Sequence, residues 1–373
     1  MLLSPFDVKR GLWEAHISSG ELGSSGAINQ YHLKTEEANS FDRETVVLFR
    51  IHHSLCDGVS LSVAIGDLAD ESEQLKERIK QEFCRKLTQH KNYTRILFKA
   101  ALALWYCFAS ILVFLLQLWR VMTASSPFDR VLRESTIPPG ARSITWKNIG
   151  SLQEVKLVSK SLSKSTTVND LAVYLVAHAV RCQLTEHGVE KEKKSTTTNV
   201  NVVIPVHLNG GIIRDGESVG NKIGAFVASI PLPNKNDDLT FTPQAISKAL
   251  QRGKNSPAAL VSWILAKLTS TYTPNWFSRY MIKKFNAKSV AVISNVKGWP
   301  FHVHWLGRKV GSLCAFLPLP PGIPIGIVLQ SYDGQVSFSI NADKRAVPDA
   351  NKFAQWMLDE FHRVQNKKCD MKN

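Results

Sequence analysis

The sequence has no closely spaced cysteine pair, and it has fewer acidic than basic side chains. The six cysteines among 373 residues form no CxxC pair and show no regular spacing. This argues against a disulfide framework and against a structural zinc site, and it favours reduced thiols. Lys and Arg number 46 against 31 Asp and Glu, so the formal net charge is +15. Because no nucleic-acid-binding motif accompanies this charge, we expect no nucleic-acid partner.

Internal repeats and long low-complexity tracts are also absent, and the chain is long enough for two half-domains. Alternating strand-like and helix-like patterns predict an α/β protein. Strands are expected at 11–17, 46–51, 144–146, 154–158, 200–206, 225–231, 290–296, 302–305, 311–316, 325–330 and 336–341. Helices are expected at 59–69, 70–95, 168–185, 243–252, 257–270, 276–285 and 349–362, with a loop at 127–142.

The stretch with the most specific chemistry follows the second predicted strand. His52 and His53 stand side by side there, and Asp57 and Gly58 come shortly after them. Histidine titrates near neutral pH, so it suits the removal of a proton from a hydroxyl group. Glycine permits a positive φ or the close approach of a ligand. No residue near Cys56 marks that thiol as a nucleophile.

This stretch, HHSLCDG, resembles the HHxxxDG motif of the CoA-dependent acyltransferase superfamily. Other segments resemble motifs of its wax ester synthase/diacylglycerol acyltransferase family, in the family's order: Leu12-Trp13-Glu14, Asn169-Asp170, Gly220-Asn221-Lys222-Ile223-Gly224 and Ser294-Asn295-Val296-Lys297-Gly298. Three positions depart from the family pattern, because Gly11, Lys297 and Trp299 stand where proline is usual. The DFGWG motif of the plant BAHD acyltransferases is absent, which counts against that group.

The resemblance implies a chloramphenicol-acetyltransferase-like α/β fold, in which two mixed-sheet halves face each other across a tunnel. It places His53 at their interface as the general base, with His52 as its neighbour in the motif. By the same resemblance, Asp57 is a structural carboxylate that shapes the loop, and Gly58 leaves room for substrate. Trp13 is a candidate for the acyl-binding side, although ordinary core packing would explain a tryptophan there equally well.

Asn169 and Asp170 open one of the predicted helices. By resemblance this pair supports the active site, and by its chemistry it is also a good N-cap, so both roles stay open. The oxyanion formed during acyl transfer needs a hydrogen-bond donor, for which Asn295 and Asn169 are candidates. His302 and His304 alternate on a predicted strand, but no third ligand is evident, so we expect no metal site.

Residues 100–119 are almost wholly apolar and follow a basic helix, which favours attraction to anionic lipid. Trp105, Tyr106 and Trp119 could serve as interfacial anchors, and burial in a protein core is the alternative. A single crossing of a bilayer would separate His53 from the C-terminal half. We therefore expect this apolar helix to associate with the membrane in a monotopic or hairpin-like manner.

These segments predict an incomplete N-terminal half at 1–70, a charged helix and apolar segment at 71–125, a linker at 126–143, and a C-terminal O-acyltransferase half at 144–373. The first half is expected to be incomplete because family members carry a substantial segment before the Leu-Trp strand.

The reaction implied by the resemblance is acyl transfer from acyl-CoA to a fatty alcohol or diacylglycerol, without a resident cofactor. We expect a lipid bilayer as partner and the endoplasmic reticulum membrane as location. Two alternatives stay open. One is a truncated, non-catalytic membrane protein that binds acyl-CoA or lipid, and the other is a transferase that acts on a small soluble acceptor or an amine.

Overall fold

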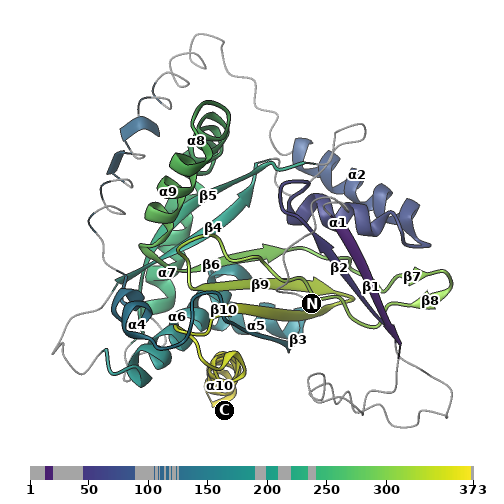
Figure 1. Ribbon diagram of the computed structural model, residues 1–373. Coiled ribbons are helices and arrows are strands. Elements are labelled where there is room, and N and C mark those ends of the chain that lie inside the picture. Colours follow the sequence, from purple (N-terminus) through teal and green to yellow (C-terminus); the bar gives the residue numbers. More distant parts are fainter. Residues whose placement is uncertain are drawn as a thin grey trace. The chain divides into compact units, whose positions relative to one another are not determined.

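The computed structural model describes residues 13–19, 45–88, 105, 108, 110–112, 115–116, 119, 123, 126–189, 199–208, 220–233 and 241–370. The chain forms two compact units, Met1–Asp57 with Ser218–Asn221, and Gly58–Glu217 with Lys222–Asn373. We call them the N-terminal unit and the main unit and describe each by itself; Figure 1 labels their elements. The division falls inside the HHxxxDG motif, between Asp57 and Gly58. The domain boundaries expected from the sequence stay a prediction.

The described part of the N-terminal unit centres on a two-stranded antiparallel ribbon, whose two strands were predicted. It consists of β1 (Trp13–Ser19) and β2 (Thr45–Ile51), with Trp13 opposite Ile51. The buried guanidinium of Arg50 donates a hydrogen bond of 2.9 Å to Glu14 across the ribbon. An opposite-charge pair at facing positions stabilises such a ribbon and fixes its register. The register of β2 on β1 therefore fixes where the histidine motif begins.

Six strands of the main unit form one mixed sheet in the order β3-β10-β9-β6-β4-β5. Their bounds are β3 (Arg142–Ser151), β4 (Asn199–His207), β5 (Ile223–Pro231), β6 (Ser289–Val296), β9 (Ile325–Tyr332) and β10 (Gln335–Asp343). Strand β6 runs parallel to β4 and β9, and the other neighbours are antiparallel. β9 is buried along almost its whole length, as expected for a strand covered on both faces.

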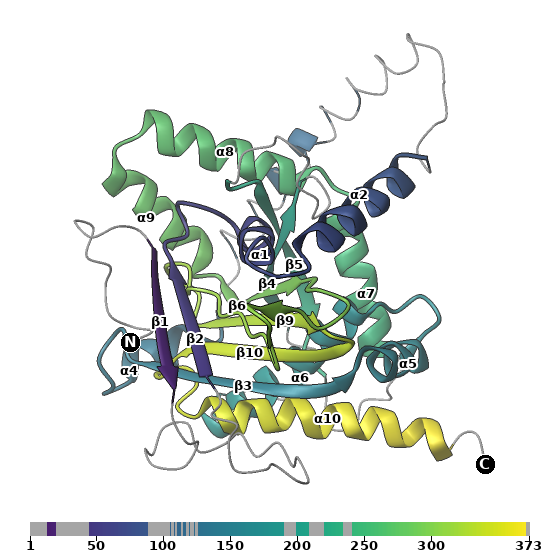
Figure 2. The ribbon, with the colours of Figure 1, turned by 90° about the vertical axis from the view of Figure 1, so that its right-hand side faces the viewer.

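The helices supply the rest of the core. They are α1 (Gly58–Gly66), α2 (Ser72–Thr88), α4 (Phe128–Glu134), α5 (Leu152–Leu162), α6 (Val168–Glu186), α7 (Phe241–Lys254), α8 (Ala258–Tyr272), α9 (Asn275–Asn286) and α10 (Ala350–Asp370). α6 is buried on nearly every side and shares a core with α5, α7, α10 and the sheet. Figure 2 shows α10 running beside β3. The α/β class is as predicted, and the arrangement of two halves around a tunnel stays a prediction.

Three local predictions were wrong. Residues 154–158, expected as a strand, belong to α5, which starts with a capping box: Ser151 Oγ accepts from the Glu154 N–H, and the Glu154 carboxylate accepts from the Ser151 N–H. That Ser-x-x-Glu spacing is a helix-start signal that the sequence already contained. The loop expected at 127–142 contains α4, because Phe128 is fully buried in the core. Residues 311–316 form no strand.

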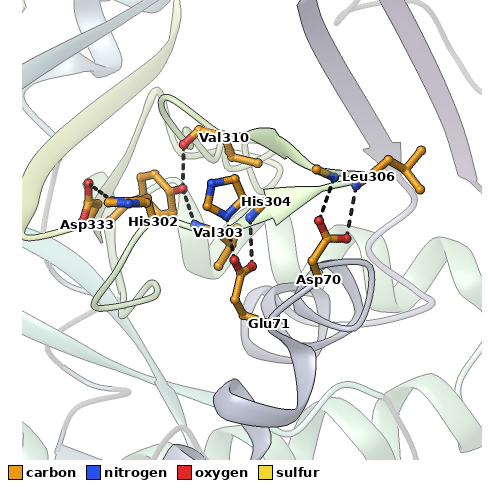
Figure 3. A network of polar contacts seen from close by, with 10 residues as sticks. Asp70, Glu71, His302, Val303, His304, Leu306, Val310 and Asp333 are labelled. Atoms are coloured by element: carbon orange, nitrogen blue, oxygen red, sulfur yellow. Dashed lines mark hydrogen bonds and ion pairs between the residues drawn. The ribbon is translucent and has the colours of Figure 1, made fainter.

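A short hairpin, β7 (His304–Trp305) and β8 (Arg308–Lys309), follows β6. Its two turn residues, Leu306 and Gly307, have φ values of 52° and 73°, as a tight hairpin turn requires. A positive φ is unfavourable for leucine. The Asp70 carboxylate accepts hydrogen bonds from both turn N–H groups, at 3.2 and 2.8 Å (Figure 3). Asp70 thereby holds the strained turn in place.

The neighbouring carboxylate completes this attachment. Glu71 Oε2 accepts a 2.9 Å hydrogen bond from the His304 N–H, and Oε1 lies 2.6 Å from His304 Nδ1 (Figure 3). The backbone bond and then the side-chain bond lower the pKa of Glu71, so the carboxylate is ionised at neutral pH. The turn between α1 and α2 is therefore fastened to the hairpin. This fixes α1, which begins directly after Asp57, to the body of the main unit.

The apolar helix expected at 100–119 lies largely outside the described residues. Its described positions are helical, and Trp105 and Trp119 are exposed, whereas Tyr106 is not described. In the part of the chain that the structure describes, no helix is long and apolar enough to cross a membrane. The added membrane-associating helix thus has no support from the structure.

Candidate active site

The histidine motif follows β2 directly, and its two rings have different surroundings. His52 Nδ1 lies 2.7 Å from Ser54 Oγ and accepts a longer hydrogen bond, 3.3 Å, from the Ser54 N–H. The ring of His52 is therefore engaged within its own loop. His53 is exposed, and among the described residues none hydrogen-bonds its imidazole. Of the two rings, that of His53 is the better placed to accept a proton from another molecule.

A side chain from much later in the sequence holds the backbone of this loop. Asn221 Nδ2 donates to the carbonyl oxygen of His53 at 2.7 Å and to that of Ser54 at 3.3 Å. The adjacent Gly220 carbonyl accepts a hydrogen bond from the Asp57 N–H at 3.3 Å. The Asn221 and His53 positions are 168 residues apart. Gly220 and Asn221 therefore bind both the start and the end of the motif and belong to the site.

The carboxylate and thiol of the motif are buried. Asp57 is 1% exposed, as suits a residue that shapes a loop rather than one that meets substrate. Burial, and then the charge of Asp57, raises the pKa of the Cys56 thiol. A protonated thiol is a poor nucleophile, which agrees with the absence of any activating neighbour in the sequence. Both observations argue against covalent catalysis by Cys56.

Gly58 does not have the backbone conformation that would demand glycine. It is the first residue of α1, and its φ is not positive, so that expected reason for a glycine was wrong. A Cβ atom at Gly58 would meet Val296 Cγ2 at 3.6 Å, an ordinary contact. Steric room for substrate beside Gly58 stays a prediction.

Helix α6 starts with a capping box in which Thr167 is the N-cap and Asp170 is the third helical residue. Thr167 Oγ1 accepts from the Asp170 N–H at 3.3 Å, and Asp170 Oδ2 accepts from the Thr167 N–H at 2.8 Å. The same oxygen accepts a 3.0 Å hydrogen bond from the Ser247 hydroxyl of α7. Asp170 is 2% exposed. The N-cap is thus Thr167 rather than the Asn169-Asp170 pair, and Asp170 takes part in capping as the partner of Thr167. A role of Asn169-Asp170 in the active site stays a prediction.

The remaining candidates fall in different units. Asn169 is half-buried at the start of α6, and Asn295 is exposed near the end of β6, both in the main unit. His52, His53 and Asp57 belong to the N-terminal unit. The oxyanion donors therefore stay a prediction.

Trp13 and the two later histidines can be judged by their surroundings. Trp13 is 64% exposed on β1, so ordinary core packing does not explain it, and its acyl-side role stays a prediction. The rings of His302 and His304 lie 5.9 Å apart, but each pairs with its own carboxylate, Asp333 and Glu71. No group of three or more metal-ligating side chains occurs within the described ranges.

Sequence comparisons relate this geometry to known proteins. The model of the "WS/DGAT C-terminal domain" matches residues 219–365, a range that includes Asn221 and Asn295. "Wax ester synthase/diacylglycerol acyltransferase 2" of Arabidopsis thaliana is 23% identical over 393 residues, which cover 98% of this chain and 75% of that protein. These matches relate the chain to the wax ester synthase/diacylglycerol acyltransferase family.

Other similar proteins carry related names. A "probable" diacylglycerol O-acyltransferase of Mycobacterium tuberculosis is 25% identical over 252 residues, covering 65% of this chain and 49% of the relative. Among solved structures, the wax ester synthase/diacylglycerol acyltransferase from Marinobacter aquaeolei VT8 matches with a TM-score of 0.49 and 17% identity. That match covers 87% of this chain and 68% of the solved one.

Within this family framework, Asn221 is the site residue whose role the sequence did not predict. The Gly220–Gly224 stretch resembled a family motif, but by itself it indicated only a glycine turn. The partners of the Asn221 amide are the carbonyls of His53 and Ser54, 168 and 167 residues earlier in the chain, so no local pattern could identify them. The only signal was the resemblance of the stretch as a whole.

Replacing Asn221 by alanine should lower kcat about 10- to 100-fold, because a base misplaced by about 1 Å loses up to a factor of that order. The KM for acyl-CoA should change little, and steady-state kinetics measure both. Asn221→Asp keeps the size of the side chain but replaces the amide donor by a carboxylate oxygen. Its kcat should therefore fall by the same factor as in the alanine variant. Asn221 is exposed, so neither change should shift the unfolding midpoint. Wild-type kcat in both variants would show that Asn221 does not contribute to catalysis.

Proposed function

We propose that this protein transfers an acyl group from acyl-CoA to the hydroxyl of a fatty alcohol or a diacylglycerol, forming a wax ester or a triacylglycerol. Its relation to that family supports an acyltransferase activity. The names of the relatives from Arabidopsis thaliana and Mycobacterium tuberculosis include wax ester and diacylglycerol, and a wax ester forms from a fatty alcohol. One observation carries the proposal: a chain related to this family presents an exposed His53 in an HHxxxDG loop that Asn221 holds.

In the proposed mechanism His53 is the general base. Its imidazole takes the hydroxyl proton while the oxygen forms a bond to the thioester carbonyl carbon. The resulting oxyanion needs a donor, for which Asn169 and Asn295 remain candidates. Collapse of this intermediate breaks the C–S bond, and the leaving thiolate of CoA takes the proton from the imidazolium. No acyl-enzyme is part of this mechanism, because the acyl group passes directly between two substrates bound together. Burial also raises the pKa of the Cys56 thiol, which disfavours the thiolate that a covalent step would need.

The proposal assigns the other motif residues supporting roles. Asp57 shapes the loop from a buried position, and His52 is engaged by Ser54 in the same loop. No resident cofactor is part of the mechanism, because acyl-CoA is a co-substrate. We place the protein at a membrane, the endoplasmic reticulum membrane in particular, since both acyl donor and lipid acceptor concentrate there.

The test is an acyl-transfer assay on the full chain. Membranes containing the protein are incubated with radiolabelled palmitoyl-CoA and either hexadecanol or diacylglycerol, and the lipid products are separated by chromatography. We expect labelled wax ester or triacylglycerol that depends on both the protein and the acceptor. A short amine acceptor serves as the control for a soluble-acceptor enzyme. A protein that binds palmitoyl-CoA but forms no ester with any acceptor would contradict the proposal.

A further inference from the structure

Helices α8 and α9 form a hairpin whose base is attached closely to the main unit. Gly224 of β5 lies so near α8 that a Cβ atom there would stand 1.8 Å from the Ala259 carbonyl oxygen. Ser262 Oγ accepts a 2.7 Å hydrogen bond from the Ala225 N–H. At the other end, a Cβ at Gly322 would stand 2.7 Å from a carbonyl oxygen of α9. Figure 2 shows the two helices meeting at an apex beyond the sheet. The hairpin is thus attached to the main unit at both ends.

This hairpin exposes an unusual number of large apolar side chains. Only Ala258 of α8 is buried, and no residue of α9 is. Exposed residues recur every fourth position along α8 and lie on one face: Leu260, Ile264, Leu268 and Tyr272. The start of α9 adds Trp276, 71% exposed, with Phe277 and Tyr280 beside it. Contiguous exposed apolar surface of this kind marks an interaction site.

Hydrogen bonds join the two helices at the apex. Ser278 Oγ lies 2.7 Å from Thr273 Oγ1 and donates to the Thr269 carbonyl at 3.3 Å. The exposed face of α8 therefore continues onto the start of α9 as one surface rather than two independent ones. We call it the hairpin surface and define it by the exposed apolar residues named above.

The charge around this surface has one sign. The sequence contains no aspartate or glutamate between Asp238 and Asp333. The exposed charged residues of the hairpin are all basic: Lys267, Arg279, Lys283 and Lys284. Two of them stand over aromatic rings, with Lys267 Nζ 5.3 Å from the Trp263 centroid and Lys284 Nζ 5.5 Å from that of Tyr280. Cations beside Trp and Tyr are the combination found where proteins meet lipid headgroups.

We propose that the hairpin surface docks the protein onto an anionic phospholipid bilayer. The apolar side chains of α8 and Trp276 enter the interface, and the basic side chains meet lipid phosphates. Because α8 has 15 residues and a spanning helix needs about 20, the hairpin lies in the interface and does not cross it. This proposal is independent of the acyl-transfer chemistry and does not involve residues 100–119.

The experiment is flotation of the full chain with vesicles. Phosphatidylcholine vesicles are compared with vesicles containing phosphatidylserine, each at low and high salt. We expect binding that needs phosphatidylserine and weakens at high salt. The variant Arg279→Gln/Lys283→Gln/Lys284→Gln should bind about 100-fold more weakly, at about fivefold for each basic side chain. A matched control, Lys156→Gln/Lys160→Gln/Lys164→Gln, removes the same charge elsewhere in the main unit and should bind like the wild type.

A second variant tests the apolar contribution separately. Trp276→Ser/Tyr280→Ser should weaken binding at least tenfold, and it should lose the part of tryptophan quenching by brominated lipid that Trp276 supplies. All these side chains are exposed, so circular dichroism and the melting midpoint should stay at wild-type values. Wild-type binding by both hairpin variants would overturn the proposal and assign docking to another segment. Equal loss in the control variant would overturn it in favour of unspecific charge attraction.

Discussion

His53→Ala lowers kcat for ester formation by about 10²- to 10⁴-fold in our expectation, the range typical of a lost general base. The reason is chemical: a neutral hydroxyl is a weak nucleophile, and no other described side chain of the loop can take its proton as readily. Asp57 is buried, Cys56 is protonated, and His52 is engaged by Ser54. Single-turnover assays with labelled acyl-CoA and hexadecanol measure the chemical step without the contribution of product release.

His52→Ala is the matched control for this prediction, because it removes the same side chain from the preceding position. In this variant kcat should fall roughly tenfold, since the substitution disturbs the loop without removing the base. His53 is exposed, so its replacement should leave the unfolding midpoint unchanged, and added imidazole should restore part of the activity. Equal product from wild type and His53→Ala would rule out His53 as the base, although the protein could still be an acyltransferase.

The parts of the structure that the sequence predicted well are those governed by short-range patterns. The helix expected at 168–185 is α6, because a polar N-cap precedes an apolar run that can only be buried. The strand before the histidines and the central strands of the sheet were likewise marked by apolar, β-branched residues. The motif residues themselves were identified by resemblance to a family.

The features that the sequence did not reveal depend on partners far apart in the chain. Nothing near Asn221 indicates that its amide faces the His53 carbonyl. Nothing near Leu306 indicates that Asp70 holds it at a positive φ. The exposure of α8 could not be predicted from the sequence either, because an apolar helical pattern normally indicates a buried helix. Local pattern gives the element, but only the tertiary structure shows whether its apolar face is covered.

Asp170→Ala should lower the free energy of unfolding by about 1.5–5 kcal/mol. Loss of the capping box accounts for about 0.5–2 kcal/mol. The rest comes from the buried Ser247 hydroxyl, which would lose its acceptor, at about 1–3 kcal/mol for an unsatisfied buried group. Both effects occur at the start of α6, the helix at the centre of the core, so they act on the main unit as a whole. Urea denaturation followed by circular dichroism measures the change.

Asp170→Asn distinguishes the cap from the alternative role that the sequence left open. The asparagine carbonyl oxygen can still accept hydrogen bonds from the Thr167 N–H and the Ser247 hydroxyl, so most of the stability should return. If capping is the main role of Asp170, activity should follow stability: low in the alanine variant and near wild type in the asparagine variant. An alanine variant as stable as the wild type would contradict the capping account. Full stability with no activity in Asp170→Asn would instead mean that the reaction itself requires the carboxylate.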